Sequence, residues 1–338
     1  MITGVNFYIY QSGTLKLENK SIVYILKNDK KLYIPIKQVY HLHIFGEVNL
    51  NKRILQQLNK ENVTITFYNY YGTMIGNFIP SRCKSGKLMM EQVNAYQEKQ
   101  CRHYIVRKMM DADIHQMIQV LLYYHKQGYD FIKQIECLRV CKQQINNLLL
   151  SNDDYVGKAL MIEAKSKQIY YQVFDIVCSA TKFRFERRST QPPENEINAM
   201  MSYGYALLYS DILSHIQRSD LLSEISFIHS ANSKQSTLQY DLADIFKPIL
   251  IDRIVLRMIR RNQINLEDFL YRANGCFMSP EGCKKFVKEY DKQMKITVYD
   301  SRSKRKYSYQ QLLKRDVYIL RNYIEHKEEY RYHPYKAR

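Results

Sequence analysis

The sequence predicts an α+β protein, with an N-terminal β-sandwich-like domain followed by a larger all-α domain. Over the first 80 residues, short runs rich in Val, Ile, Tyr and Thr alternate with turn residues, which is typical of strands. After Pro80 no proline occurs until Pro192, and the only glycines past Gly86 in that interval are Gly128 and Gly157. Because proline and glycine disfavour helix interiors, their scarcity favours long helices.

The first domain is predicted over residues 1–80. Turns containing Gly, Asn or Ser separate its strands, and one short helix is expected at about 50–60, with Asn49 as a candidate N-cap. Several closely spaced strands in a small domain indicate a sandwich-like arrangement of sheets. The candidate strands are VNFYIY, TLKLE, SIVYIL, KLYIPI and VTITFY.

A basic, turn-prone segment at 81–90 is the predicted linker, and the helical domain follows over 91–323. We expect 324–338 to be a basic tail that is disordered until it meets a partner, because the last 38 residues hold 11 Lys or Arg against 4 acids. The candidate helices run over about 89–125, 130–150, 154–180, 194–217, 235–262, 266–273, 279–293 and 308–323.

A formal net charge of +18, from 51 Lys and Arg against 33 acidic residues, indicates a polyanionic partner. Nucleic acid is the commonest such partner, an anionic membrane surface is another, and a merely solvated basic surface is the alternative. No run of about 18 apolar residues exists and the N-terminus lacks the pattern of a signal peptide, so we expect no membrane segment. Seven scattered cysteines without an export signal suggest reduced thiols in a cytoplasm.

Several common catalytic motifs are missing from the chain. It contains no GxxxxGKS or GxxxxGKT phosphate loop, no GxGxxG after a strand, no GxSxG and no HExxH. The sequence therefore gives no support to nucleotide hydrolysis, dinucleotide chemistry, serine hydrolysis or zinc proteolysis.

An acidic pair stands out in this basic chain. Asp241 and Asp244 are three residues apart in STLQYDLADIFKP, so a helix would place both carboxylates on one face. A divalent cation that grips a phosphate is one reason to keep such a pair. The alternative is a pair of surface acids near a helix N-terminus, where the helix dipole favours negative charge.

Two further residues could join this pair. Glu163 lies within the apolar run ALMIEA, where a buried carboxylate needs a partner or a metal, although it could instead face solvent beside Lys165 and Lys167. His229 closes the apolar stretch ISFIH and could equally be a satisfied core histidine. Spacing alone does not show that these segments meet. If they do, two carboxylates and one imidazole suit Mg²⁺ or Mn²⁺.

Three basic segments flank the acidic residues. KFRFERR at 182–188 ends in Arg187 and Arg188, and SRSKRKYS at 301–308 reads as a mobile basic loop. Each segment alone could be a solvated face, but together they favour a path for DNA phosphates. The third segment holds four arginines at helical spacing, Arg253, Arg257, Arg260 and Arg261.

The order of these segments resembles the CRISPR-associated spacer-acquisition integrase family, the first-numbered Cas proteins. Glu163 in EAxSxxxYY is followed by PPENEINAMMSYGYALLYSDI, then by His229, then by STLQYDLADIFKPILID. LYIPIKQVYHLHIFGEVNL and VTITFYNYYGTMIGNFIP resemble the family's β-domain, so the similarity spans nearly the whole chain. The combination of NAMMSYGYALLYS with a downstream histidine and DLADIFKP carries the resemblance.

This resemblance implies an N-terminal β-sandwich that dimerises and an α-helical catalytic domain. It implies a metal, Mg²⁺ or Mn²⁺, held by Glu163, His229 and Asp244, with Asp241 as a supporting or alternative acid. Proteins of the family form homodimers bridged by a small ferredoxin-like partner, the second-numbered Cas protein, in the prokaryotic cytoplasm. They join the 3′-hydroxyl ends of short double-stranded DNA fragments to a repeat array, and they also act as endonucleases.

Two departures from the family pattern concern the surroundings of the site. Ala164 stands where a glycine is common, and SDLLSEISFIHS lacks the usual Gly-Leu-x-Pro-x-x-Gly form before His229. A non-catalytic basic DNA-binding scaffold, whose acids are structural, is the alternative function. An RNA-binding module has less support, because the chain has no RNP-type or KH-type signature.

Overall fold

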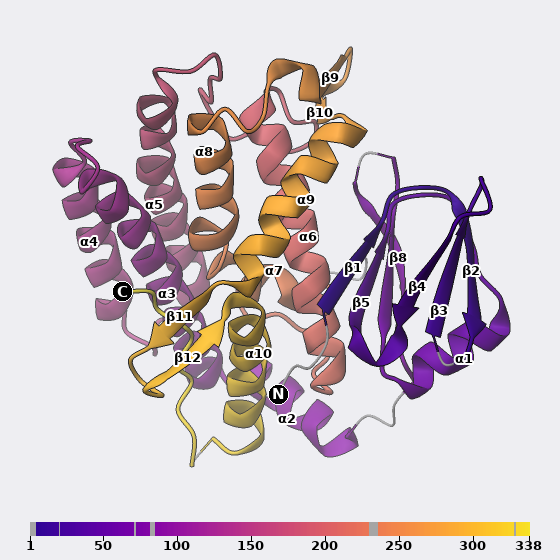
Figure 1. Cartoon of the computed structure of the whole chain (residues 1–338). Helices are drawn as coiled ribbons and strands as arrows, with labels where there is room; N and C mark the ends of the chain where they lie inside the picture. The colour runs from indigo at the N-terminus through magenta and orange to yellow at the C-terminus, as the bar shows by residue number, and fades with distance from the viewer. Residues whose placement is uncertain (1–4, 20, 71, 82–84, 230–235, 328) are drawn as a thin grey trace. The chain divides into compact units, whose positions relative to one another are not determined.

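The computed structural model describes residues 5–19, 21–70, 72–81, 85–229, 236–327 and 329–338 (Figure 1). The chain separates into two compact units, Met1–Lys84 and Ser85–Arg338. Residues 82–84 of the predicted linker and residue 235 of a predicted helix lie outside the described residues.

The N-terminal unit contains two four-stranded sheets. The first has the order β1 (Val5–Ile9), β5 (Val39–Ile44), β7 (Thr64–Tyr68) and β8 (Met74–Phe78), with β1, β5 and β7 parallel and β8 antiparallel to β7. The second has the order β4 (Lys31–Pro35), β3 (Ser21–Leu26), β2 (Gly13–Glu18) and β6 (Val48–Asn49), antiparallel except for the parallel β2–β6 pair.

Both sheets contribute to one hydrophobic core. Leu42 and Ile65 from the first sheet and Leu15 from the second belong to the same cluster of buried side chains. Helix α1 (Lys52–Lys60) packs its apolar residues into this cluster. Asn51 caps α1 by accepting a hydrogen bond from the Ile54 amide at 3.0 Å. The sequence analysis placed this cap two residues too early, because Asn49 and Asn51 are both suitable capping residues.

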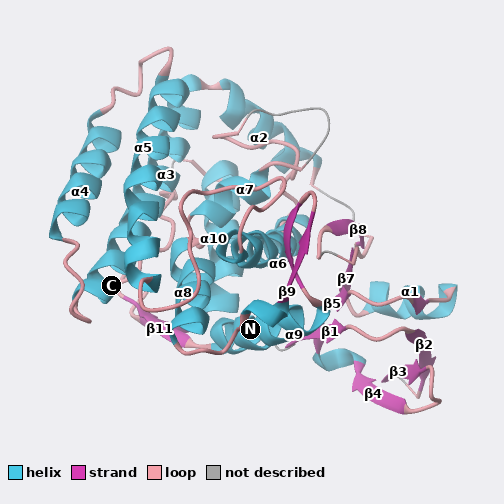
Figure 2. Cartoon of the chain, turned by 90° about the horizontal axis from the view of Figure 1, so that it is seen from above, coloured by secondary structure: helices cyan, strands magenta, loops and turns pink. Residues whose placement is uncertain are grey.

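The C-terminal unit is mainly helical (Figure 2). Helices α3, α4 and α5 pack against one another, and α3 is buried along most of its length. The helices of this unit are α2 (Gly86–Gln97), α3 (Lys99–His125), α4 (Ile132–Asn147), α5 (Tyr155–Cys178), α6 (Glu196–Arg218), α7 (Leu238–Asp244), α8 (Arg253–Arg260), α9 (Pro280–Lys295) and α10 (Tyr309–Glu325).

The prediction of an all-α second domain is wrong in one respect, because the unit also contains two β-hairpins. Strand β9 (Phe269–Arg272) pairs with β10 (Gly275–Met278), and β11 (Thr297–Asp300) pairs with β12 (Arg305–Ser308). The helix predicted at 266–273 is instead a short 3₁₀ turn followed by β9. Gly275, with φ of 130°, supplies backbone freedom that most residues lack at this hairpin.

Two predicted helices are interrupted. The helix predicted at 89–125 is divided at Glu98, which is extended (ψ 102°), so that α2 and α3 are separate helices. The helix predicted at 235–262 consists of α7, a π-helical turn at Pro248–Asp252 and α8. Proline has no backbone N–H to donate, and the turn at Pro248 is closed by a hydrogen bond from the Asp252 amide to the Lys247 carbonyl, five residues earlier, at 3.0 Å.

The last ten residues are anchored by buried side chains, in contrast to the disordered tail that the sequence suggests. The Tyr332 side chain is fully buried and the Tyr335 side chain is 3% exposed. The Tyr335 amide donates to Asp316 Oδ2 at 2.7 Å, on α10, and the Ala337 amide donates to Gln116 Oε1 at 3.0 Å, on α3. The buried tyrosines therefore hold in place a segment that its net charge alone predicts to be mobile.

Within the described ranges, no helix has the length and apolar composition that spanning a membrane requires.

We predict that Tyr332→Ala lowers the free energy of unfolding by about 3 kcal/mol, because a fully buried aromatic side chain is removed and leaves a cavity. Chemical denaturation of the full chain measures this change. Tyr330→Ala is the matched control, since Tyr330 is 47% exposed and should change stability by less than about 0.5 kcal/mol. Equal effects of the two substitutions would contradict the packed position of this segment.

Candidate metal centre

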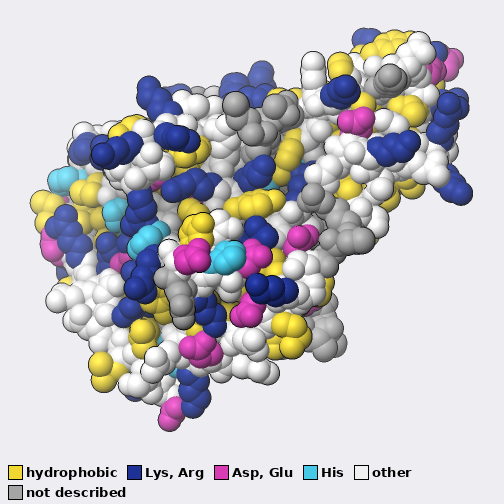
Figure 3. Space-filling view, turned by 90° about the horizontal axis from the view of Figure 1, so that it is seen from below, with side chains coloured by type: hydrophobic (Ala, Val, Ile, Leu, Met, Phe, Trp, Pro, Cys, Tyr) yellow, Lys and Arg dark blue, Asp and Glu magenta, His cyan; other side chains and the backbone are white. Residues whose placement is uncertain are grey.

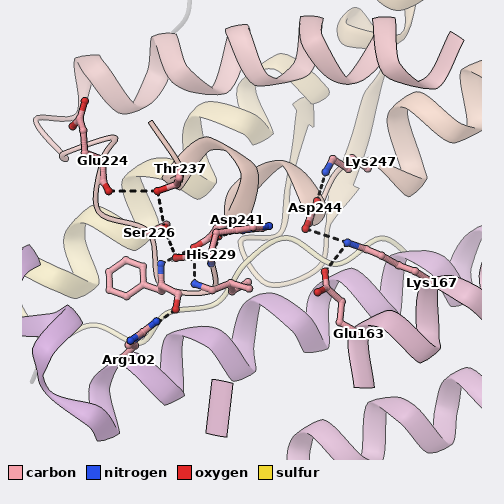
Figure 4. Close-up of polar contacts among 12 residues, drawn as sticks. Arg102, Glu163, Lys167, Glu224, Ser226, His229, Thr237, Asp241, Asp244 and Lys247 are labelled. Atoms are coloured by element: carbon pink, nitrogen blue, oxygen red, sulfur yellow. Dashed lines mark hydrogen bonds and ion pairs between the residues drawn. The ribbon is translucent and has the colours of Figure 1, made fainter. Parts of the chain in front are cut away.

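Three segments of the C-terminal unit bring the candidate site together (Figure 4). Helix α5 supplies Glu163 and, one turn later, Lys167. Helix α7 supplies Asp241 and Asp244, and the segment before the residues at 230–235 supplies His229. The three sequence-predicted ligands therefore come from three elements that lie in one region of the helical unit.

Glu163 lies on the buried face of α5. Ala159, Ser166 and Tyr170, at helical spacing from it, are each at most 1% exposed, and Glu163 itself is 7% exposed. The alternative in which this glutamate faces solvent is therefore not the arrangement in the structure. A carboxylate on such a face requires a compensating charge, and Lys167 Nζ lies 2.6 Å from Glu163 Oε1.

Asp241 is fully buried and organises the segment that carries His229. Its Oδ2 accepts hydrogen bonds from the Phe227 amide at 2.6 Å and the Ile228 amide at 2.9 Å. Its Oδ1 accepts from the His229 amide at 3.3 Å and from His229 Nδ1 at 2.6 Å. Asp241 thus shapes the backbone and orients the imidazole, which leaves His229 Nε2 as the ring nitrogen that can bind a metal.

Side chains around the His229 segment add further hydrogen bonds. Ser226 Oγ donates to the His229 carbonyl at 2.6 Å and accepts from Thr237 Oγ1 at 2.8 Å. Arg102 Nε, on α3, donates to the Phe227 carbonyl at 3.0 Å. These contacts hold a segment that lacks the glycines and proline usual in the resembled family.

The electrostatic surroundings of His229 connect it to the acids. The hydrogen bond to Asp241 is the main cause that raises the pKa of His229 above its ordinary value of 6.5, and burial opposes this effect. The negative charges of Asp244 and Glu163 also raise the pKa. The charges of both other candidate ligands therefore act on the imidazole. The His229 side chain is 42% exposed, so an ion from solvent has access to it.

Asp244 lies between two lysines. Lys167 Nζ is 3.3 Å from Asp244 Oδ2, and the Lys247 ammonium donates to Asp244 Oδ1. Burial raises the pKa of Asp244, but the ammonium groups of Lys167 and Lys247 outweigh burial and hold this pKa well below its usual range. Asp244 is thus a charged carboxylate even though it is 4% exposed.

A further carboxyl of this region, Asp113 on α3, was not among the residues predicted from the sequence. This carboxyl is 3% exposed, and no hydrogen bond to Asp113 Oδ2 exists among the described residues. Burial raises the pKa of Asp113 well above its usual range; Lys167 opposes the rise, and Asp244 and Glu163 add to it. Asp113 stands between Asp111 and His115 in MMDADIHQM, a polar stretch that could have drawn attention to it, but only the fold shows that its carboxyl is buried.

These residues fit a divalent metal of the Mg²⁺ or Mn²⁺ type. Two carboxylates from different helices and an imidazole held in one orientation are the ligand types that such ions accept. A cation, the Lys167 ammonium, already contacts one oxygen of each carboxylate, so both acids face the same positive charge. The ligand atoms of Glu163, His229 and Asp244 do not all lie within 4.8 Å of one another, so a bound ion would have to draw them closer. Glu163, Asp244 and His229 could therefore hold the metal, and Asp241 supports His229 from behind.

The predicted DNA-binding arginines take part in local contacts. Arg187, with a side chain that is 76% exposed, forms an ion pair with Glu194 at 3.1 Å. Arg188 is directed inward, where its guanidinium contacts Asn198 Oδ1 at 2.9 Å and lies over the Tyr205 ring. Of these two arginines, only Arg187 presents its charge to solvent.

The three predicted arginines on α8 also differ in how far they are exposed to solvent. Arg253 lies over the Tyr123 ring at 4.4 Å, and Arg257 donates to Gln293 Oε1 at 2.8 Å. Arg260 is exposed and donates to Gln127 Oε1 at 2.5 Å. The space-filling view shows Lys and Arg side chains spread over much of the displayed face, with a group of acidic and histidine side chains near its middle (Figure 3).

The fold and the site can be compared with known proteins. Residues 7–292 match the family model of the CRISPR associated protein Cas1. A CRISPR-associated endonuclease Cas1 of Thermodesulfovibrio yellowstonii is 30% identical over 96% of this chain and 97% of that protein. A CRISPR-associated endonuclease Cas1 of Haloferax volcanii is 31% identical over 97% of this chain and 98% of its own length. The chain belongs to the Cas1 family.

Solved structures agree with this membership. A CAS1 protein from Thermotoga maritima matches with a TM-score of 0.83 and 30% identity, over 96% of this chain and 99% of that chain. A casposase bound to integration product shares the fold, with a TM-score of 0.83 at 18% identity over 96% and 92% of the two chains. A chain of a Cas6-RT-Cas1–Cas2 complex also shares it, with a TM-score of 0.81 at 16% identity over 99% of this chain and 36% of that chain.

We predict that Asp241→Asn lowers the pKa of His229 in the metal-free protein, because the hydrogen bond to Asp241 is the main cause of its elevation. An NMR titration of the His229 ring proton measures both values. The wild-type midpoint should lie above 6.5 and the variant midpoint below that of the wild type. Identical midpoints in two folded proteins would show that Asp241 does not control this imidazole.

Proposed function

We propose that this protein is a metal-dependent DNA integrase and endonuclease of CRISPR adaptation. In this function it joins the 3′-hydroxyl ends of short DNA fragments to a repeat array by phosphodiester transesterification. One observation carries the proposal: Glu163 and Asp244, which come from separate helices, both contact the Lys167 ammonium. The negative charges of these two acids also act on the His229 imidazole. The endonuclease names of the full-length relatives and the fold shared with a casposase support it.

The proposed metal ligands are Glu163, His229 and Asp244, with Mg²⁺ or Mn²⁺ as the ion. A bound ion of this kind polarises a phosphate oxygen and stabilises the charge that develops on the attacking or leaving oxygen. Asp241 acts as a positioning residue, since it fixes the ring of His229 and accepts hydrogen bonds from three backbone amides of the same segment.

The chain's own residues hold the strands for an in-line exchange. A bond forms between the 3′-oxygen of the fragment and the phosphorus of the repeat, and the bond from that phosphorus to the repeat's own 3′-oxygen breaks. The leaving oxygen takes up a proton and no protein nucleophile is required. Positioning of the reacting groups is the principal contribution of such a site. Water in place of the 3′-hydroxyl gives endonuclease cleavage.

Basic side chains would hold the DNA phosphates. Arg187 and Arg260 are the best placed of the predicted set because they are exposed, whereas Arg188, Arg253 and Arg257 are only partly exposed. Guanidinium groups bind phosphate oxygens well, often with two hydrogen bonds. The double-stranded partners in this proposal are the captured fragment and the repeat array.

The family also suggests an assembly for this protein. We infer a homodimer formed through the N-terminal unit, residues 1–80, whose two sheets we interpret as a β-sandwich. The helical unit, predicted from the sequence to span residues 91–323, is the proposed catalytic domain. The small ferredoxin-like second-numbered Cas protein, Cas2, is the proposed bridging partner, in line with the Cas1–Cas2 complex that contains the same fold. The proposed location is the prokaryotic cytoplasm.

A non-catalytic DNA-binding scaffold is the second candidate function. The net charge of +18 favours DNA binding without any chemistry, and the lysines that neutralise Asp244 and Glu163 would suit a purely structural role for these acids. A scaffold binds DNA with a steep salt dependence and has no requirement for a metal. Metal dependence therefore separates the two functions.

We predict that Glu163→Gln, Asp244→Asn and His229→Ala each reduce strand joining by about 100-fold or more, because each removes a proposed metal ligand. The assay follows insertion of a labelled oligonucleotide into a plasmid with a repeat array, in the presence of Cas2 and Mn²⁺ or Mg²⁺. Glu281→Gln is the control, since the Glu281 side chain is 71% exposed and lies on α9. Full joining by the three folded variants would exclude the proposed site.

We further predict that Mn²⁺ raises the melting temperature of the wild-type protein by about 2 °C or more, because an ion that binds only the folded state stabilises it. Glu163→Gln should abolish this increase, and Glu281→Gln should retain it. Differential scanning calorimetry after treatment with a chelator measures the effect. A scaffold predicts no change on metal addition in any of the three proteins.

A further inference from the structure

Lys167 occupies the position between the two carboxylates of the candidate metal centre. Its Nζ lies 2.6 Å from Glu163 Oε1 and 3.3 Å from Asp244 Oδ2. The first acid is one turn earlier on the same helix, and the second comes from α7 (Figure 4). The Lys167 ammonium therefore links helix α5 to helix α7. A lysine that paired only with an acid on its own helix would not make this link.

A divalent ion and this ammonium cannot share the position. Carboxylate oxygens lie about 2.0–2.2 Å from Mg²⁺ or Mn²⁺, so an ion bound by both Glu163 and Asp244 would lie where Lys167 Nζ is now held. The long and flexible lysine side chain can move, whereas the two carboxylates are fixed on helices. Entry of the ion thus requires that Lys167 withdraws.

Asp113 offers the withdrawn ammonium a new partner. It is a buried carboxyl on α3, its Oδ2 accepts no hydrogen bond among the described residues, and Lys167 is the charged group with the largest influence on it. Among the carboxyl groups that act electrostatically on Lys167, Asp244 has the largest effect, Glu163 follows, and Asp113 is third. A buried polar atom without a partner is costly, so an approaching ammonium would satisfy it.

We propose that Lys167 is an internal counter-cation of the metal centre, which holds Glu163 and Asp244 together before the metal binds and moves to Asp113 when it enters. The inference rests on the proposed function and deepens it. Without Lys167, Lys247 would still pair with Asp244, but the buried Glu163 carboxylate would lose its counter-charge and the site would lose stability. The same ammonium must be displaced by the metal, so it also weakens metal binding.

The test is calorimetric titration of Mn²⁺ into the chelator-treated full-length protein, together with its melting temperature without metal. Lys167→Met removes the ammonium and keeps an unbranched apolar stem. Asp113→Asn keeps the size of the side chain and removes its ability to ionise when the ammonium approaches. The double variant completes a cycle that measures the coupling of the two residues. Lys165→Met is the matched control, because Lys165 is an exposed lysine on the same helix.

The proposal expects Lys167→Met to bind Mn²⁺ about tenfold more tightly than the wild type, since a competing cation is absent, and to melt several degrees lower without metal. Asp113→Asn should weaken Mn²⁺ binding in the wild-type background and have little effect in the Lys167→Met background. Lys165→Met should leave both quantities unchanged.

Unchanged or weaker Mn²⁺ binding by Lys167→Met would overturn the counter-cation role. An equal effect of Asp113→Asn in both backgrounds would show that Asp113 acts on the ion directly, and would overturn its role as the receiving carboxylate. Glu163→Gln separates these results from a failure of the proposed function. If Mn²⁺ binding is absent from the wild type, or the same in Glu163→Gln, the metal site itself is wrong and this inference falls with it.

Discussion

The burial of carboxylates inside a helical unit is the constraint on which the site depends. Glu163, Asp241 and Asp244 are all less than 10% exposed, and a buried charge is tolerated only when other groups compensate it. Asp113 is equally buried, and burial raises its pKa well above the usual range. Backbone amides and an imidazole compensate Asp241, and lysine ammonium groups compensate Glu163 and Asp244. These compensating contacts draw α5, α7 and the His229 segment to one place.

The two aspartates of α7 have different tasks although they are only three residues apart. Asp241 is directed toward the backbone that carries His229, and Asp244 toward two lysines and the neighbouring helix (Figure 4). The first acid builds the site and the second presents charge within it. One carboxylate is thus used for structure and the other is left for a cation, which is the division that the proposed metal centre requires.

Much of this arrangement could be predicted from the sequence, and the missing parts have physical reasons. The spacing of Asp241 and Asp244 and the apolar surroundings of Glu163 indicated the acids, and the family resemblance joined them to His229. Periodicity could not identify Asp113, since a polar stretch that also holds Asp111 and His115 reads as a surface face until its helix is placed in the core. Nor could charge patterns predict that Arg188 would be directed inward, or that tyrosines would anchor the C-terminal segment.

The central claim is that Glu163, His229 and Asp244 surround one divalent ion. Anomalous diffraction from crystals of the full-length protein grown with Mn²⁺ tests it most directly. The account predicts one strong manganese peak about 2.0–2.2 Å from a carboxylate oxygen of Glu163, a carboxylate oxygen of Asp244 and Nε2 of His229. A peak bound by other residues, or these three side chains without a peak in a crystal that holds manganese elsewhere, would contradict it.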